Sequence, residues 1–271
     1  LLAECALSDL TCIDRLGATV DGRDLHRIIV GTGTLQFWVI ARQHPGESMA
    51  SWWMEGFLAR LIDAHDAISR RLRRMATVYV VPHMNPDGAI RGHLRCNAAG
   101  ANLNREWASG VYEGYDAPTL ERSPEVYWTL KAMDELGMDA HVDIHGDEAI
   151  AANFFAGTEG IPSWDESLAV QLKALSDAFL RRSPDFQVGL GYDVEPPGEG
   201  NMAVGSNAVA ERYNDPGTFT SLIGYEWTSQ PGGGNLHRVV IFRDDKALTD
   251  KILPYSAFDS EDAEGLWTFM A

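Results

Sequence analysis

Short apolar runs alternate with helical segments along the first 180 residues, and no other feature of the sequence constrains the fold as strongly. Residues 27–31, 35–41 and 77–82 are apolar and bounded by turn-forming residues, as strands are. Apolar residues recur at near-helical spacing over 48–62, and a further helix is expected over 163–182. Strands that alternate with helices favour an α/β fold, with a largely parallel sheet covered by helices on both faces.

Shorter signals predict the remaining elements. Ser123 as N-cap, followed by Pro124, predicts a helix that runs to about residue 136. Ser163 and Glu166 form a capping box at the start of the helix over 163–182. The other predicted elements are strands at 140–144, 153–156 and 219–225, a short helix at 206–213, an irregular segment over 83–118 and a Gly- and Pro-rich loop over 185–205.

Charge and composition exclude several classes of protein. The chain has 22 Lys and Arg against 39 Asp and Glu, a formal net charge of −17. Nucleic-acid affinity comes mainly from Lys and Arg that neutralise phosphates, so we expect no nucleic-acid partner. No apolar run approaches the roughly 18 residues of a membrane span, so we expect no membrane partner either. Three cysteines are too few for a disulfide framework, which favours free thiols and a cytoplasmic location.

The segment 41–47 (ARQHPGE) joins a predicted strand directly to a predicted helix. Ligands bind outside the carboxyl ends of strands in open α/β sheets, so His44 and Glu47 lie where chemistry is expected. An imidazole and a carboxylate three residues apart on a turn can both reach one metal ion. A surface turn with a Glu at the helix start is the alternative for this motif in isolation.

A second candidate ligand, His145, ends the apolar strand predicted at 140–144. With His44 and Glu47 it completes the His₂Glu set of catalytic zinc peptidases. Taken alone, His145 can also be a hydrogen-bonded structural residue. His141 lies deeper in the same strand, and we expect it to be structural.

Two further segments carry groups that can act on a substrate. The loop after 77–82 contains Arg95 and Arg105, and guanidinium groups bind carboxylates through paired hydrogen bonds. Salt bridges to the protein's own acids are the alternative. Glu226 ends an apolar strand, where a carboxylate near zinc can act as a general base. An exposed Glu at the sheet edge is the alternative there.

In combination, these motifs resemble the zinc metallocarboxypeptidase family. The motifs, in chain order, are 44–47 (HPGE), 85–88 (NPDG), 104–105 (NR) and His145. Their surroundings resemble the cytosolic-carboxypeptidase (deglutamylase-like) branch, especially its bacterial members. The resemblance implies a mixed, largely parallel sheet of about eight strands with helices on both faces. It also implies one catalytic domain over residues 1–271, without the upstream β-sandwich domain that this branch usually carries.

The resemblance also assigns roles to single residues. It implies one Zn²⁺ per chain, and the implied ligands are His44, Glu47 and His145. Asn104 and Arg105 match the pair that binds the C-terminal carboxylate of a peptide or protein substrate. Arg95 matches the arginine that polarises the scissile carbonyl.

Two further roles are assigned from the order of the motifs along the chain: the general base and the residue that contacts the side chain of the released amino acid. Glu226 matches the base, with Glu211 or Asp215 as the alternative. Arg212 is the candidate for meeting an acidic side chain of the substrate, and a surface ion pair is the alternative. The family often has Asp where this chain has Asn102. An Asn carbonyl can still accept from the imidazole Nδ1–H, but without the charge that raises ligand basicity.

The leading hypothesis is a zinc-dependent metallocarboxypeptidase that hydrolyses the C-terminal peptide bond and releases an acidic residue, such as Glu. A zinc amidohydrolase that deacylates small N-acyl amino acids is one alternative, because such enzymes share the ligand set and an Asn-Arg pair. The segment 85–88 followed by Arg95 favours the peptidase over this alternative. A zinc-binding peptide-recognition module that lacks the base is the other alternative.

Overall fold

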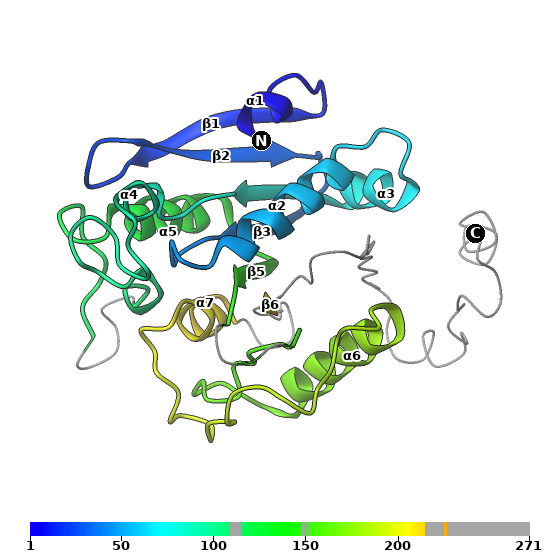
Figure 1. Ribbon diagram of the computed structural model, residues 1–271. Helices are drawn as coiled ribbons and strands as arrows, with labels where there is room; N and C mark the ends of the chain where they lie inside the picture. Colours follow the sequence, from blue (N-terminus) through cyan, green and yellow to red (C-terminus); the bar gives the residue numbers. More distant parts are fainter. Residues whose placement is uncertain (109–114, 148–149, 151, 215–224, 227–271) are drawn as a thin grey trace.

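The computed structural model describes residues 1–108, 115–147, 150, 152–214 and 225–226 of the chain (Figure 1). Its strands are β1 (Thr11–Ala18), β2 (Asp24–Val30), β3 (Leu35–Ala41), β4 (Ala76–Val81), β5 (Ala140–His145) and β6 (Tyr225–Glu226). Its helices are α1 (Leu2–Cys5), α2 (Ser48–Leu61), α3 (Ala67–Met75), α4 (Pro86–Arg91), α5 (Pro124–Leu136), α6 (Glu166–Arg182) and α7 (Gly205–Tyr213), with a 3₁₀ turn at Leu103–Arg105.

The six described strands form one mixed sheet in the order β1-β2-β4-β3-β5-β6. β4, β3, β5 and β6 run parallel to one another, and β1 and β2 add an antiparallel hairpin at one side. The predicted mixed, largely parallel α/β sheet is therefore confirmed. The described residues supply six of the roughly eight strands expected from the family resemblance.

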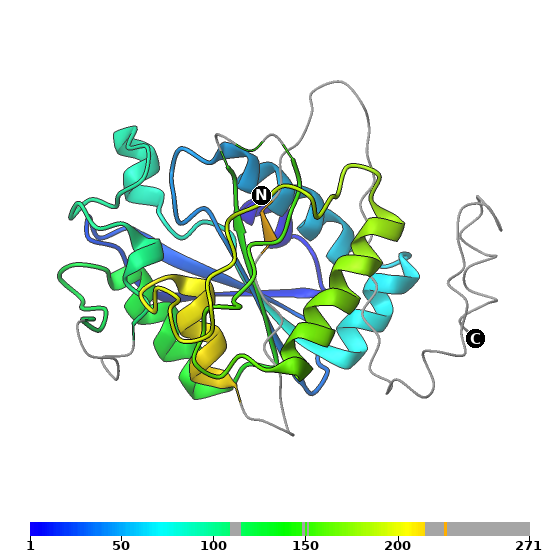
Figure 2. The same ribbon diagram turned by 90° about the horizontal axis from the view of Figure 1, so that it is seen from below.

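Helices cover both faces of the sheet, and alternate side chains of each central strand serve the two faces. In β3, Val39 packs with Met54 and Leu58 of α2, whereas Ile40 packs with Val126 and other residues of α5. Figure 2 shows α2 on one side of the strands and α5 and α7 on the other. Burial on both faces explains why β3 is a continuous apolar run with no polar alternation.

Several predicted bounds agree with the structure, and one cap was assigned to the wrong residue. The strand 35–41 and the helix from Pro124 to residue 136 have the predicted limits. The helix predicted over 163–182 begins at Glu166, because Asp165 and not Ser163 is its cap. Asp165 Oδ1 accepts a hydrogen bond from the backbone N–H of Leu168 at 2.9 Å.

Other differences concern short or half-exposed elements. The strand predicted at 153–156 is a single bridge between Asn153 and Phe186. The segment 83–118, expected to be irregular, contains α4 and the 3₁₀ turn. The edge strand β1 was not predicted, since most of its residues are only partly buried and its apolar pattern is weak. Of the strand predicted at 219–225, residues 219–224 lie outside the described part, and β6 begins at Tyr225.

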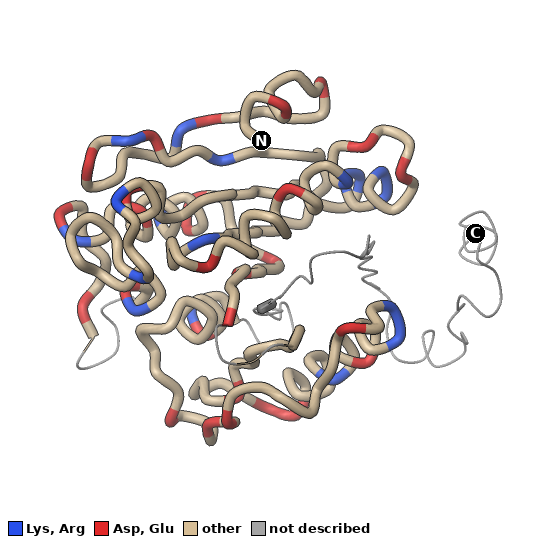
Figure 3. The backbone as a smooth tube through the Cα atoms, in the orientation of Figure 1, with Lys and Arg blue, Asp and Glu red and all other residues tan. Residues whose placement is uncertain are grey.

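The cysteines, the charged residues and the helices of the described part can be compared with what the composition predicted. The three cysteines are free thiols, as predicted. Acidic and basic residues are interspersed along the backbone, with a group of basic residues on α3 (Figure 3). Among the helices that the structure describes, none has the length and apolar character needed to cross a membrane.

Glu125 ties α5 to the long loop that leads to the 3₁₀ turn. The residue is fully buried, and its Oε2 accepts from Asn97 Nδ2 at 3.1 Å. Asn97 in turn accepts from the backbone N–H groups of Ala99 and Ala101 at 3.0 and 2.9 Å. Burial, together with the nearby charge of Asp87, raises the pKa of Glu125 to about 7. The carboxyl is thus neutral in the folded protein at mildly acid pH.

We predict that Glu125→Gln removes a pH dependence of stability. An unfolded Glu loses its proton near pH 4.5, whereas the folded Glu125 keeps it to about pH 7. The wild-type free energy of unfolding should therefore fall as the pH rises from 4.5 to 7, by about 3 kcal/mol from this group. Urea unfolding at pH 5 and pH 8 measures the effect. Equal pH dependence in both proteins would contradict the prediction.

Candidate metal centre

The turn that carries His44 and Glu47 is shaped by its own backbone and by the loop beside it. Arg42, directly after β3, has a φ of 61°, and its guanidinium donates to the carbonyl oxygen of Pro45. The N–H of Gly46 donates to the carbonyl oxygen of Leu94 at 2.8 Å. A Cβ at residue 46 would lie 2.8 Å from that oxygen, so this close approach requires glycine.

The two predicted histidine ligands meet the predicted carboxylate ligand at one point. His44 Nδ1 lies 2.5 Å from Glu47 Oε1, and His145 Nδ1 lies 2.9 Å from Glu47 Oε2. The ligand atoms of the three residues lie within 4.8 Å of one another, and all three side chains are buried. Within the described part of the chain, no other group of three His, Cys, Asp or Glu converges in this way. Two imidazole nitrogens and one carboxylate suit zinc.

Burial and hydrogen bonding shift the pKa values of Glu47 and His145 in opposite directions. Burial alone would raise the pKa of Glu47, but hydrogen bonds from His145 and His44 lower it to about 2. Burial alone would lower the pKa of His145, but Asp143 and Glu47 raise it well above its usual value. A bound zinc ion would require neutral imidazoles, so it would compete with a proton for this cluster.

The second nitrogen of each histidine also has a partner. His44 Nε2 lies 3.0 Å from Asn102 Oδ1, and His145 Nε2 lies 2.9 Å from Asp143 Oδ2. The histidine contact of Asn102 agrees with the sequence-based expectation, although the structure uses Nε2 and not Nδ1. Such outer partners fix the orientation of a ligating imidazole and raise its basicity.

The predicted carboxylate-binding pair adjoins the metal cluster. Asn104 Nδ2 lies 3.3 Å from His145 Nε2, and Asn104 Oδ1 accepts from the N–H of Gly205 at 2.7 Å. Arg105 is exposed and donates to the carbonyl oxygen of Asn104 at 2.6 Å. Desolvation and the positive charge of nearby Arg95 lower the pKa of Arg105. Both arginines thus belong to the same edge of the molecule.

Arg212 pairs with an acidic residue of another helix. Its guanidinium donates to both carboxylate oxygens of Asp134 at 2.9 and 2.7 Å, which joins α7 to α5. The hydroxyl of Tyr213 donates to the same carboxylate at 2.6 Å. Arg212 thus forms the surface ion pair that was the alternative to a contact with the substrate.

The backbone of Glu226 lies beside His145, one of the candidate metal ligands. In the parallel pair of β5 and β6, Glu226 is in register with His145, and Tyr225 with Ile144. Of the alternative bases, Glu211 accepts from the backbone N–H of Ser163 at 2.9 Å, and Asp215 lies outside the described residues. The role of the Glu226 carboxylate stays a prediction.

Sequence reasoning missed three buried residues around the cluster, namely Gln43, Trp107 and Asp143. Asp143 had a usable signal, since it lies two residues before His145 and therefore on the same face of β5.

His141, expected to be structural, is fully buried. Neither of its ring nitrogens has a hydrogen-bond partner among the described residues, and burial lowers its pKa to about 4.

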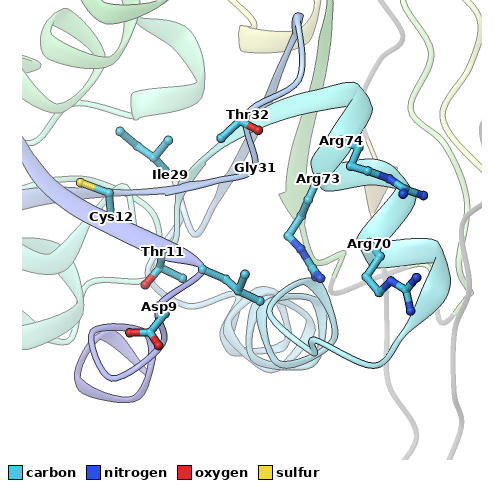
Figure 4. A pocket seen from close by; sticks show the side chains of 10 residues that line it. Asp9, Thr11, Cys12, Ile29, Gly31, Thr32, Arg70, Arg73 and Arg74 are labelled. Carbon is cyan, nitrogen blue, oxygen red and sulfur yellow. The ribbon is translucent and has the colours of Figure 1, made fainter.

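A hollow of about 500 Å³ lies at the other end of the sheet, between β1 and α3 (Figure 4). Its lining includes Thr11, Cys12 and Thr32, together with Arg70 and Arg73 of α3. Residues 31 and 32 follow β2 and lead into the amino end of β3, so the hollow is remote from the carboxyl ends that carry His44 and His145. None of the predicted site residues lines it.

Two family models match different parts of the chain. A model described as zinc carboxypeptidase matches residues 3–188, which include His44, Glu47 and His145. A model described as a protein of unknown function (DUF3604) matches residues 200–271, which include Arg212 and Glu226.

Individual relatives agree with the first model. An uncharacterized protein of Zymomonas mobilis is 46% identical over 213 residues, which cover 79% of this chain and 54% of that protein. Cytosolic carboxypeptidase 4 of Homo sapiens is 40% identical over 113 residues, 40% of this chain and 9% of that protein. A metallo-carboxypeptidase of Pseudomonas aeruginosa in complex with (2-guanidinoethylmercapto)succinic acid is 38% identical with a TM-score of 0.74, covering 83% of this chain and 57% of that one. The chain thus spans little more than half the length of the Zymomonas mobilis and Pseudomonas aeruginosa proteins.

We predict that Asn102→Asp strengthens zinc binding. The aspartate keeps an oxygen 3.0 Å from His44 Nε2 but adds the negative charge that raises imidazole basicity. Zinc affinity should rise about tenfold, and it should fall about tenfold in Asn102→Ala, because outer partners of ligating histidines typically contribute 10- to 100-fold. Competition with a chromophoric chelator measures both.

His44→Ala is the reference for a lost ligand and should bind no zinc at this affinity. Thermal unfolding of the metal-free variants controls for a general loss of structure. Equal zinc affinity in Asn102→Asp, Asn102→Ala and the wild type would contradict a role for this contact.

Proposed function

The chain belongs to the zinc carboxypeptidase family, and from this premise we propose that it hydrolyses the peptide bond next to a free C-terminal carboxylate. One observation carries the proposal. The convergent ligands His44, Glu47 and His145 lie at the same edge as Asn104, whose Nδ2 is 3.3 Å from His145 Nε2. A metal centre next to a carboxylate-binding pair suits an exopeptidase.

The proposed roles follow from the chemistry of the groups. When bound, zinc supplies a Lewis acid and lowers the pKa of a water molecule toward neutrality. Arg105 and Asn104 hold the substrate carboxylate, which sets the register of the chain to be cut. Arg95 donates to the carbonyl oxygen of the scissile bond, where negative charge develops. Glu226 accepts the proton of the attacking water and delivers it to the leaving amine.

The finer part of the proposal is that the released residue is acidic, such as Glu. The adjacent arginines Arg95 and Arg105 support an anionic substrate end. The ligand of the Pseudomonas aeruginosa structure, (2-guanidinoethylmercapto)succinic acid, carries a cationic guanidino group as well as two carboxylates, so it supports a carboxylate-binding site but does not favour an acidic released residue over a basic one. Arg212 is not part of this proposal, because Asp134 already occupies its guanidinium.

We extend the proposal to a cytoplasmic enzyme that acts on peptides or protein tails without nucleic acid or membrane. The name of the human relative, cytosolic carboxypeptidase 4, supports the location. A panel of peptides ending in Glu, Leu or Lys, assayed beside N-acetyl-aspartate, distinguishes the peptidase from an amidohydrolase. Release of Glu before Leu supports the proposal, hydrolysis of N-acetyl-aspartate alone favours the amidohydrolase, and zinc binding without any hydrolysis favours a recognition module.

We predict that Arg105→Ala raises KM for peptides with a free C-terminus by about 10- to 100-fold, since a hydrogen bond to a charged group contributes about 1.5–3 kcal/mol. C-terminally amidated peptides should be poor substrates of the wild type and should change little. Arg91→Ala is the matched control, because Arg91 is an exposed arginine of the same segment, paired with Asp21. Equal wild-type rates on free-acid and amidated peptides would overturn the exopeptidase proposal.

We predict that Glu226→Gln lowers kcat at least about 100-fold and leaves KM and zinc content nearly unchanged, because general acid–base catalysis contributes about 10²–10⁴-fold. Glu211→Gln serves as the control, since its carboxylate binds the backbone of Ser163. Near-normal turnover in Glu226→Gln, with loss in Glu211→Gln or Asp215→Asn, would reassign the base.

A further inference from the structure

Two buried side chains that belong to neither the ligand set nor the substrate contacts join in a line behind His145. Trp107 Nε1 donates to Gln43 Oε1 at 2.8 Å, and Gln43 Nε2 donates to Asp143 Oδ2 at 2.5 Å. The same Oδ2 lies 2.9 Å from His145 Nε2. Trp107, Gln43 and Asp143 are at most 2% exposed, so water does not compete for these contacts.

The first member of this line sets the orientation of the Gln43 amide, and the carboxylate of Asp143, which can only accept, sets the direction of the hydrogen bond to His145. An indole N–H can only donate, so the atom of the Gln43 amide that faces Trp107 must be the oxygen. The amide NH₂ then faces Asp143 and donates to its carboxylate. A carboxylate that accepts from Gln43 also accepts from His145, which places the imidazole proton on Nε2. The lone pair of His145 Nδ1 is thereby left for the metal.

A competing contact makes this control necessary. Asn104 Nδ2 lies 3.3 Å from the same His145 Nε2, and the bond from Gly205 N–H to Asn104 Oδ1 keeps the Asn104 NH₂ group pointed there. A donor at this position favours an unprotonated Nε2, which would put the proton on Nδ1 and block the metal. The Asp143 contact is shorter and involves a charged group, so it is the stronger of the two.

Asp143 itself depends on Gln43. Its second oxygen, Oδ1, is buried and has no hydrogen-bond partner among the residues that the structure describes. Its Oδ2 accepts from Gln43 Nε2 as well as from His145 Nε2, so Gln43 is the second donor that holds the carboxylate in place. Without that donor the buried carboxylate would have only His145 to hold it, so its orientation would be less well fixed.

We propose that Trp107 and Gln43 are positioning residues for zinc, which fix the Nε2–H tautomer of His145 through Asp143 and so direct its Nδ1 at the metal. The inference rests on the zinc-binding part of the proposed function and not on peptide hydrolysis. Gln43 directly precedes His44, and Trp107 follows the Asn104–Arg105 pair by two residues. The line thus connects the substrate-binding turn with the metal centre.

Zinc affinity of three variants tests the proposal. Trp107→Phe keeps the ring but removes the donor that orients Gln43, and it should weaken zinc binding about tenfold. Gln43→Met removes the donor to Asp143 and should weaken it by about 10- to 100-fold, the range typical of outer partners. Trp38→Phe is the matched control. Trp38 is equally buried in the same apolar cluster as Trp107, and its indole N–H donates at 3.0 Å to the carbonyl oxygen of Gly137, away from the metal ligands.

The control separates a directed effect from a general loss of packing. Trp38→Phe should leave zinc affinity within about twofold of wild type, although it should lower thermal stability about as much as Trp107→Phe does. Wild-type zinc affinity in folded Trp107→Phe and Gln43→Met would overturn the proposal, and so would an equal loss of affinity in Trp38→Phe. Failure of the wild type to bind zinc would instead refute the proposed function.

A measurement on the wild type needs no variant to fold. ¹⁵N-edited NMR of the zinc-loaded protein should show His145 with its proton on Nε2 and its Nδ1 bound to metal. In zinc-loaded Trp107→Phe, the Nε2 proton should exchange faster with solvent. A proton on Nδ1 of His145 in the wild type would refute the assignment, whatever the activity of the enzyme.

Discussion

The site depends on one shared carboxylate, that of Glu47, which holds both histidine ligands through its two oxygens. Its Oε1 contacts His44, and its Oε2 contacts His145, 98 residues away along the chain, and accepts from the N–H of Gly146. Glu47 also occupies the N-cap position of α2. The positive end of the helix dipole favours a negative side chain there, which helps to offset the cost of burying it. Removal of this carboxylate would therefore separate two parts of the fold as well as remove a ligand.

Register within the parallel sheet brings these parts together. Ala41 at the end of β3 pairs with Ile144 near the end of β5, and His145 pairs with Glu226 of β6. Three strand ends thus meet at one edge, in the arrangement in which open α/β sheets bind ligands. A shift of β5 by one residue would turn His145 toward the opposite face, because side chains alternate along a strand. The apolar side chains buried on both faces oppose such a shift, so the core fixes the geometry of the site.

The sequence was sufficient for features that local chemistry decides. The apolar run at 35–41, buried on both faces, marked β3 to the residue, and the positions of His44 and Glu47 after it followed from strand polarity. Features that depend on contacts between residues far apart in the chain could not be predicted from the sequence. Arg212 looked available in the sequence, but its partner Asp134 is 78 residues away on another helix. Trp107 and Gln43 are 64 residues apart, and only the fold brings the indole to the amide.

The two candidate ligand histidines have unlike outer partners, and this difference changes the net charge of the site. His145 faces the anion of Asp143, whereas His44 faces the neutral amide of Asn102. With a divalent cation, the charges of Glu47 and Asp143 sum with the metal to zero, whereas an Asp in place of Asn102 would give −1. By Coulomb's law, an extra charge about 10 Å from a substrate carboxylate costs roughly 1–2 kcal/mol at an effective dielectric constant near 20. Compared with a carboxylate, the amide of Asn102 should therefore hold zinc less tightly but spare any anionic group bound nearby this repulsion.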